Sequence, residues 1–275
     1  MSLHGMTIFI TGASRGIGRE IALRAAQDGA NIVIAAKSAT AHPKLSGTIH
    51  SVAEEIVALG GQALALQLDV RDEQAVAAAM QQAAEHFGGI DILINNAGAI
   101  NLAGVEYLAP AKYDLIHQVN TRAVLVCSQA ALPYLKKSRN AHILNLSPPL
   151  NLDAKWFAQY APYTISKYGM SMLTVGMSQE FKHYGIRVNS LWPRTIIATA
   201  AIEFSLGGAE LLKRGRKPSI MADAAHAMLS SQDPELTGQL CIDEEILTAQ
   251  GMTDFEQYRS QDSTEQLMID LFVNE

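Results

Sequence analysis

The sequence has few cysteines, no excess of basic residues and no long apolar run. Only 2 of its 275 residues are cysteines, Cys127 and Cys241, too few for a disulfide framework or a zinc site. Lys and Arg number 21 against 27 Asp and Glu, a net charge of −6, whereas nucleic-acid-binding surfaces are usually basic. No uncharged apolar run reaches the ~18 residues of a membrane span. We therefore expect a reduced, cytoplasmic protein with no membrane span, no nucleic-acid partner and no metal.

The residues that are present are those of a folded domain. Apolar residues make up 48% and charged residues 17%, which argues against disorder. The start, residues 1–5, lacks the basic flank and cleavage site of a signal peptide. The length fits one large α/β domain or two small ones, and the absence of a low-complexity linker favours one. We expect a single domain over 1–250 and a polar C-terminal tail over 251–275, which either packs on the domain or contacts a partner.

Apolar runs and amphipathic stretches alternate along the chain. The alternation predicts a parallel sheet with helices on both faces, that is, a doubly wound α/β fold of about seven strands. The predicted strands are 6–10, 31–36, 63–68, 90–94, 142–146, 186–190 and 238–242. The predicted helices are 16–28, 51–59, 72–87, 111–137, 162–183 and a stretch over 199–229 broken by Gly207-Gly208 and Gly215.

A glycine-rich turn follows the first predicted strand and opens the first helix. Glycines there let the backbone approach a pyrophosphate, and the helix N-terminus offers unpaired N–H groups. The candidate cofactor-binding residues are Thr11, Gly12, Ser14, Arg15, Gly16, Ile17 and Gly18. An ordinary glycine-rich turn is the alternative, but the strand–turn–helix context favours a dinucleotide site of the Rossmann type.

The end of the second strand indicates which dinucleotide is bound. NAD-specific sites usually place Asp or Glu there, whereas this chain has Lys37, with Arg15 close by in the glycine turn. Two cations favour a 2′-phosphate and therefore NADP(H), unless Lys37 is simply a solvated lysine. After the third strand, Asp69 and Val70 are candidates for the adenine, although Asp69 could instead cap helix 72–87.

Two further motifs carry chemistry. After the fourth strand, Asn95-Asn96-Ala97-Gly98 combines small residues, which leave room for a cofactor, with amides that can tie strands together. Tyr163 and Lys167 are four residues apart and so share one face of a helix. An ammonium beside a phenol lowers its pKa from about 10, which would make Tyr163 a general acid or base. An ordinary helix-surface pair is the alternative.

Together these motifs resemble the short-chain dehydrogenase/reductase family over roughly residues 6–245. The motifs appear in the family's order: the Thr11–Gly18 turn, the Asn95–Gly98 turn, Asn120, and Tyr163 with Lys167. The resemblance implies hydride transfer between NADP(H) and an apolar carbonyl or alcohol, fatty-acyl or steroid-like. Tyr163 would exchange the proton, Lys167 would hold the nicotinamide ribose, and Asn120 would distort its helix and hold a relay water.

The resemblance also implies that Pro193 and Ile196 lie against the nicotinamide and that the protein is a homodimer or homotetramer. Three departures matter. Pro148 stands where the family has its substrate-orienting serine, so the neighbouring Ser147 either takes that role or is a strand-end serine. Arg194 replaces a glycine and would reach an anionic substrate or solvent. Residues 243–245, Asp-Glu-Glu, replace Asp-Gly-Gly and put the usual C-terminal oligomer contact in doubt.

Two alternatives stay open at this point. The loss of the serine at Pro148 suggests an NADP(H)-binding sensor or scaffold with little turnover. A basic cluster in the segment of about 196–220, which is expected to cover the substrate, suggests instead a 3-oxoacyl or 2,4-dienoyl thioester reductase that grips the phosphates of CoA. The cluster consists of Lys213, Arg214, Arg216 and Lys217, and a solvated charge run is its simpler interpretation.

Overall fold

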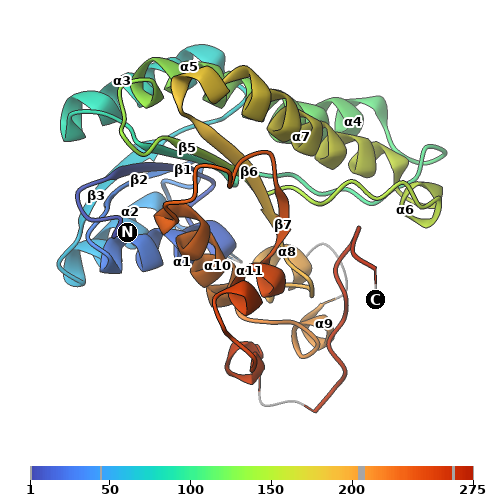
Figure 1. Cartoon of the computed structure of the whole chain (residues 1–275). Coiled ribbons are helices and arrows are strands. Elements are labelled where there is room, and N and C mark those ends of the chain that lie inside the picture. The colour runs from blue at the N-terminus through green and yellow to red at the C-terminus, as the bar shows by residue number, and fades with distance from the viewer. Residues whose placement is uncertain (1, 44, 204–207, 262–263, 275) are drawn as a thin grey trace.

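The structure is a computed structural model that describes residues 2–43, 45–203, 208–261 and 264–274. Its centre is a parallel sheet of seven strands in the order β3-β2-β1-β4-β5-β6-β7 (Figure 1). The strands are β1 (Thr7–Thr11), β2 (Asn31–Ala36), β3 (Gln62–Gln67), β4 (Ile92–Asn95), β5 (His142–Asn145), β6 (Arg187–Trp192) and β7 (Leu240–Ile242). The prediction of a doubly wound sheet is therefore confirmed, and each predicted strand is present.

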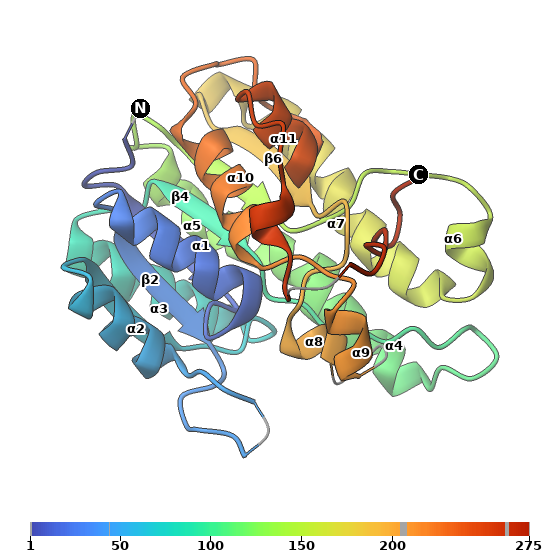
Figure 2. The same cartoon turned by 90° about the horizontal axis from the view of Figure 1, so that it is seen from below.

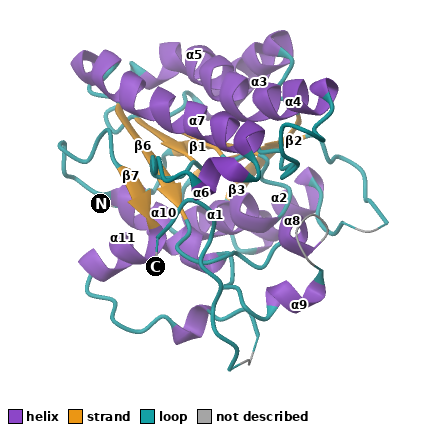
Figure 3. Cartoon of the chain, turned by 90° about the vertical axis from the view of Figure 1, so that its right-hand side faces the viewer, coloured by secondary structure: helices purple, strands orange, loops and turns teal. Residues whose placement is uncertain are grey.

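Helices form a layer on each face of this sheet (Figures 2 and 3). One layer holds α1 (Gly16–Gln27), α2 (Ile49–Ala58), α10 (Ser219–Ser230) and α11 (Asp243–Ala249). The other holds α3 (Glu73–Phe87), α4 (Pro110–His117), α5 (Ala123–Leu135) and α7 (Ala161–Glu180). The alternation along β1 shows why two layers form. Ile8 and Ile10 join the core under α1 and α10, while Phe9 joins the core under α3 and α5. No helix in the described part of the chain is long and apolar enough to cross a membrane.

The predicted helix over 111–137 is interrupted. A π-helical turn, η1 (Gln118–Arg122), separates α4 from α5 and contains Asn120. Inserted residues of this kind occur often at functional sites. Pro133 lies inside α5, two residues before the helix ends.

The predicted helical stretch over 199–229, with breaks at Gly207-Gly208 and Gly215, corresponds to separate helices among the described residues. These are α8 (Ala200–Ile202), α9 (Ala209–Leu212) and α10, which begins at Ser219. Gly207 lies outside the described residues. Gly208 has φ +76° and directly precedes α9, and a Cβ on Gly215 would lie 2.9 Å from the carbonyl oxygen of Ile196. The break expected at Gly215 therefore lies where the chain contacts the loop after β6.

The C-terminal segment packs on the domain, one of the two alternatives for it. After the short helix η4 (Glu256–Tyr258), the segment 264–274 runs beside the loop that follows β6, with Ile269 bridged to Thr195 (Figure 2). It ends near α7 and the short helix α6 (Lys155–Ala158). The tail thus reaches the carboxyl edge of the sheet.

Candidate active site

The sequence motifs meet at the carboxyl edge of the sheet. Parallel strands present their carboxyl ends at one edge, so the turns after β1, β4, β5 and β6 lie together there. The strand order reverses between β1 and β4, which leaves the crevice in which α/β folds bind ligands.

The glycine turn, called the glycine cradle below, packs so closely on the turn after β4 that larger residues would clash there. Gly12 has φ +68°, and a Cβ there would lie 2.8 Å from Cα of Ala97. A Cβ on Gly18 would lie 2.4 Å from Nδ2 of Asn96, which donates hydrogen bonds to the carbonyl oxygens of Thr11 (2.8 Å) and Gly12 (3.0 Å). The Asn96 amide thus ties β1 to β4, and the close approach requires glycine. No side chain caps the N-terminus of α1, so its first N–H groups are open to a phosphate.

The cations predicted to mark NADP(H) lie beyond the end of β2. The Arg15 guanidinium donates to Ser38 Oγ (3.2 Å) and to the carbonyl oxygen of Gly47 (2.8 Å). Lys37 is 66% exposed, and its Nζ lies 4.0 Å from Oδ2 of Asp69. The Arg15 guanidinium, the Lys37 ammonium and the Ser38 hydroxyl therefore all lie near the end of β2.

Asp69 is not a helix cap. The N-cap of α3 is Asp72, whose carboxylate accepts from the N–H groups of Gln74 and Ala75 at 3.0 Å. The alternative of a capping Asp69 is therefore wrong. The Asp69 carboxylate is instead bound by Arg71, whose hydrogen bonds hold its pKa below the usual range. The adjoining Val70 is buried.

Asn120 fixes the neighbourhood of the predicted catalytic pair. Its Nδ2 donates to the carbonyl oxygen of Ala99 and to Oγ of Ser166, both at 3.0 Å, and its Oδ1 accepts from the Ala99 N–H at 2.9 Å. Ser166 Oγ in turn donates to the Tyr163 carbonyl oxygen at 2.8 Å. The π-helical turn is thereby joined to the first turns of α7, which carry Tyr163 and Lys167.

Lys167 is buried and held by two partners. Its Nζ donates to the carbonyl oxygen of Leu146 at 2.7 Å and lies 4.8 Å from the centre of the Trp192 ring. Burial lowers the pKa of Lys167, an effect that the negative charge of Asp270 opposes. Burial equally raises the pKa of Asp270, on the C-terminal segment.

The expected lowering of the Tyr163 pKa is wrong for this geometry. Tyr163 is only 6% exposed, and this burial, with a contribution from the charge of Asp270, raises the pKa of its phenol. The Lys167 ammonium does not compensate, because its hydrogen bond goes to Leu146. The phenol is therefore protonated at neutral pH.

The structure does not assign a residue to the role of the family's substrate-orienting serine. Ser147 is fully buried, and its Oγ has no hydrogen-bond partner among the described residues. The carbonyl oxygen of Pro148 accepts from Ser171 Oγ at 2.6 Å, which fixes the backbone where the family has its serine. The role predicted for Ser147 stays a prediction.

Two residues near the site were missed from the sequence. Thr199 lies beside the glycine turn, because its Cγ2 would be 3.4 Å from a Cβ on Gly16. Phe272 is 1% exposed and packs on the Tyr163 ring with 6.2 Å between ring centres. The only signal for Phe272 was the apolar run 267–272 in an otherwise polar tail.

The residues at which this chain departs from the family pattern contact one another in the structure. Arg194, whose side chain is 30% exposed, pairs with Glu244 (3.5 Å) and Glu245 (3.2 Å) at the start of α11. Its N–H donates to the Asp243 carboxylate at 2.9 Å. The loop after β6, which carries Pro193 and Ile196, is thereby tied to the end of β7. This contact accounts for the acidic residues that replace the family's glycines.

The four cations of the basic cluster between residues 213 and 217 do not converge on one position. Lys213 pairs with Glu210, and Arg214 donates to the carbonyl oxygen of Gln266. Arg216 is buried and pairs with Glu244 at 2.9 Å, while Lys217 donates to the carbonyl oxygen of Gln257. The four cations thus point to different partners and form no common phosphate grip, so no observation now favours the thioester reductase.

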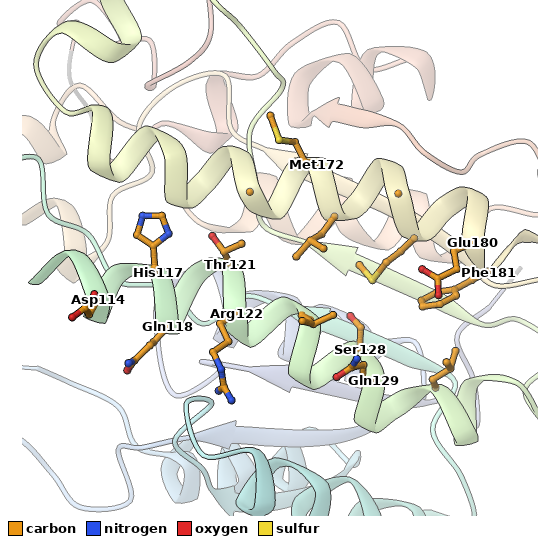
Figure 4. Close-up of a pocket in the computed structure, with 16 residues that line it drawn as sticks. Asp114, His117, Gln118, Thr121, Arg122, Ser128, Gln129, Met172, Glu180 and Phe181 are labelled. Carbon is orange, nitrogen blue, oxygen red and sulfur yellow. The ribbon is translucent and has the colours of Figure 1, made fainter. Parts of the chain in front are cut away.

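A groove of about 890 Å³ lies away from this site, between α4–α5 and α7 (Figure 4). Its lining includes His117, Thr121, Leu125 and Met172, but neither Tyr163 nor Lys167. It is a surface feature of the outer helices.

The fold and this site define a dehydrogenase class, and the comparisons agree. The family model for short chain dehydrogenases matches residues 6–205, so the chain belongs to that family, an oxidoreductase family. The chain is 56% identical over 256 residues to hydroxysteroid dehydrogenase-like protein 2 of Xenopus laevis and 55% identical over 257 residues to the human protein of that name. The matches cover 93% of this chain but only 61% and 60% of those relatives.

Solved structures are similar over most or all of the chain. A putative dehydrogenase from Xanthomonas campestris is 50% identical, with a TM-score of 0.96 and full coverage of both chains. A 7α-hydroxysteroid dehydrogenase complexed with NADH and 7-oxo glycochenodeoxycholic acid is 29% identical, with a TM-score of 0.76 over 88% of this chain and 93% of that one. The family and these neighbours indicate a nicotinamide cofactor and a small-molecule substrate.

Proposed function

We propose that the protein transfers a hydride between NADP(H) and an apolar carbonyl or alcohol, with Tyr163 as the proton donor or acceptor. The observation that carries the proposal is the Tyr163–Lys167 pair, which lies on α7 at the carboxyl edge of the sheet and is joined through Ser166 to Asn120. That edge also carries the glycine cradle.

The cofactor proposal rests on the cradle and on the cations beyond β2. Gly12 and Gly18 let the turn after β1 pack directly on Ala97 and Asn96, and no side chain caps the N-terminus of α1, an arrangement that suits a pyrophosphate. Arg15 and Lys37 favour a 2′-phosphate by charge, with Ser38 as a hydroxyl donor. For the rest of the cofactor we propose Asp69 and Val70 at the adenine, and Asn96, Ala97, Gly98, Pro193 and Ile196 towards the nicotinamide.

When bound, the nicotinamide supplies or accepts the hydride. The protein's own residues manage the proton. A protonated Tyr163 can donate to the oxygen of a carbonyl substrate, because burial raises the pKa of its phenol. We propose that Lys167, whose Nζ lies over the Trp192 ring and bonds to the carbonyl oxygen of Leu146 in the structure, holds the ribose of the bound cofactor.

An apolar substrate fits the residues that surround Tyr163. The cluster around the phenol contains Tyr168, Trp192, Phe272 and Val273, with Leu102, Leu108 and Trp156 packed against it. Apolar and aromatic walls with one convergent polar group are typical of sites for apolar ligands. Fatty-acyl and steroid-like carbonyl compounds both belong to this class.

The Tyr163→Phe variant tests the chemistry. The variant keeps the ring but has no proton to donate, so we expect kcat for NADPH-dependent ketone reduction to fall by a factor of roughly 10² to 10⁴ while NADPH binding persists. The matched control is Tyr107→Phe, since Tyr107 is 79% exposed. Unchanged turnover in Tyr163→Phe would refute the mechanism. Tight NADPH binding without any turnover in the wild type would favour the sensor or scaffold.

We also propose that a second copy of the chain covers the outer face of α5 and α7. Ile165, Met172 and Val175 on α7 are 48%, 58% and 41% exposed, and Leu125 on α5 is 42% exposed. Their spacing puts the three α7 residues on one face, and Met172 and Leu125 also line the groove in Figure 4. A contiguous apolar face of this kind is typical of a subunit interface.

A further inference from the structure

The C-terminal segment 264–274 is fastened to the loop that carries the proposed nicotinamide contacts. The N–H of Ile196 donates to the carbonyl oxygen of Met268 at 3.0 Å, and the N–H of Asp270 donates to that of Arg194 at 2.9 Å. These bonds continue the pairing of Thr195 with Ile269. The segment is therefore held in register along the active-site loop.

This register places Phe272 at the centre of an aromatic cluster. Its ring centre lies 5.7 Å from that of Trp156, 6.2 Å from Tyr163, 5.2 Å from Tyr168 and 6.0 Å from Trp192. The stack on Tyr163 is near parallel, at 28°. The ring thus occupies space directly beside the proposed proton donor.

Two further features show that this position is closely determined. The Trp192 Nε1 donates to the carbonyl oxygen of Leu271 at 2.9 Å. The C-terminal segment therefore also holds the Trp192 indole ring, over which the Lys167 Nζ lies. Phe272 has φ +73° and is the one non-glycine residue among those described with positive φ. A bulky residue rarely adopts this conformation, and it persists where the surroundings fix it, often at functional sites.

We propose that Phe272 forms a wall of the substrate site and limits the width of the carbonyl compound that reaches Tyr163. The proposal predicts that a straight chain or a single ring is accepted beside the Phe272 ring, and that a fused ring system is disfavoured because it competes with this ring for space beside Tyr163. The inference rests on the proposed function, because it assumes that the carbonyl meets the Tyr163 phenol. The inference narrows the proposed substrate class from apolar carbonyl compounds in general to those with a straight chain or a single ring.

The test compares NADPH-dependent reduction of cyclohexanone and of the fused two-ring ketone 1-decalone. We expect Phe272→Ala to raise the ratio of kcat/KM for decalone to that for cyclohexanone by about tenfold or more, since pockets discriminate shape on this scale. Phe272→Leu, which keeps an apolar side chain and guards against loss of folding, should raise it by a smaller factor. Met268→Ala is the matched control, because Met268 lies on the same segment but is 38% exposed.

An unchanged ratio in folded Phe272→Ala or Phe272→Leu would overturn the inference. If the wild type reduces no ketone, the proposed function itself has failed. A binding measurement then tests whether Phe272 limits the width of the ligand site. The chain has 2 tryptophans, and both contact Phe272, so quenching of their fluorescence by 2-acetylnaphthalene reports binding there. We expect Phe272→Ala to bind this probe about fivefold more tightly or better. Equal affinity in wild type and variant would overturn the inference.

Discussion

At the scale of single residues, the charges beside the glycine turn underlie the proposal of NADP(H). Arg15 is held by its bonds to Ser38 and Gly47, whereas Lys37 is exposed and its Nζ lies 4.0 Å from the Asp69 carboxylate. We expect two cations here to favour a 2′-phosphate over a pair of ribose hydroxyls. Lys37 is the easier of the two to change without disturbing the loop.

We expect Lys37→Asp to abolish the preference for NADPH. The carboxylate would repel a 2′-phosphate and accept hydrogen bonds from ribose hydroxyls, so the ratio of the NADH to the NADPH dissociation constant should fall by about tenfold or more. Fluorescence titration of both nucleotides measures it. Lys182→Asp, at an exposed position after α7, is the control for net charge. A variant that keeps the wild-type ratio would contradict the 2′-phosphate assignment.

At the scale of the element, β5 carries a buried titratable group into the centre of the sheet. His142 begins this strand and is fully buried, and its Nε2 lies 2.9 Å from Nδ2 of Asn189 on β6. Burial, with help from the charge of Arg187, lowers the pKa of His142 to about 3. The strand is therefore built around a neutral imidazole.

Acid should destabilise the fold through His142. Below about pH 6.5 the unfolded chain binds a proton at this residue, whereas the folded chain does so only near pH 3. The contribution of His142 is complete above pH 6.5 and is lost as the pH falls, by about 1.4 kcal/mol for each pH unit. Urea unfolding of wild type and His142→Asn at several pH values measures the difference.

The variant is needed because other buried groups titrate in the same range. Burial raises the pKa of Asp243 to about 6 and that of Asp270 to about 7, so these acids favour the folded state as the pH falls from there towards 4. His86→Asn, at an exposed position on α3, is the control. Parallel pH profiles for wild type and His142→Asn would show that His142 is not the acid-sensitive group.

At the scale of the whole molecule, the two helical layers differ in what they leave exposed. The layer of α5 and α7 shows an apolar stripe and the groove of Figure 4. The carboxyl edge, by contrast, is covered by the chain's own C-terminal segment. The proposed second copy therefore belongs on the outer helices, away from the tail.

We expect Met172→Glu to weaken the proposed oligomer. A buried carboxylate without a partner is costly at an interface, so the molar mass from light scattering should shift towards that of the monomer, 29.7 kDa. Leu59→Glu is the matched control, because Leu59 is 57% exposed beyond α2 on the other layer. A wild type that is monomeric at all concentrations would refute the interface.

Local patterns in the sequence determined the elements of the sheet and the glycine turn that we propose binds the cofactor. Apolar runs placed the strands because a buried strand needs little more than apolar side chains of the right length. The glycine turn and the Tyr163–Lys167 spacing were equally visible, because each depends on neighbours in the chain. The N-cap of α3 was not predicted correctly, because both Asp69 and Asp72 lie near the start of this helix. Only the backbone geometry shows that Asp72 is the N-cap residue.

Only the tertiary structure decided what surrounds Tyr163 and Lys167, the proposed catalytic pair. The raised pKa of Tyr163 comes from burial, to which the C-terminal segment with Phe272 contributes. The place of Phe272 follows from pairing of the tail with the loop after β6. Periodicity and spacing carry information about neighbours along the chain, whereas these contacts depend on which surfaces the folded elements bring together.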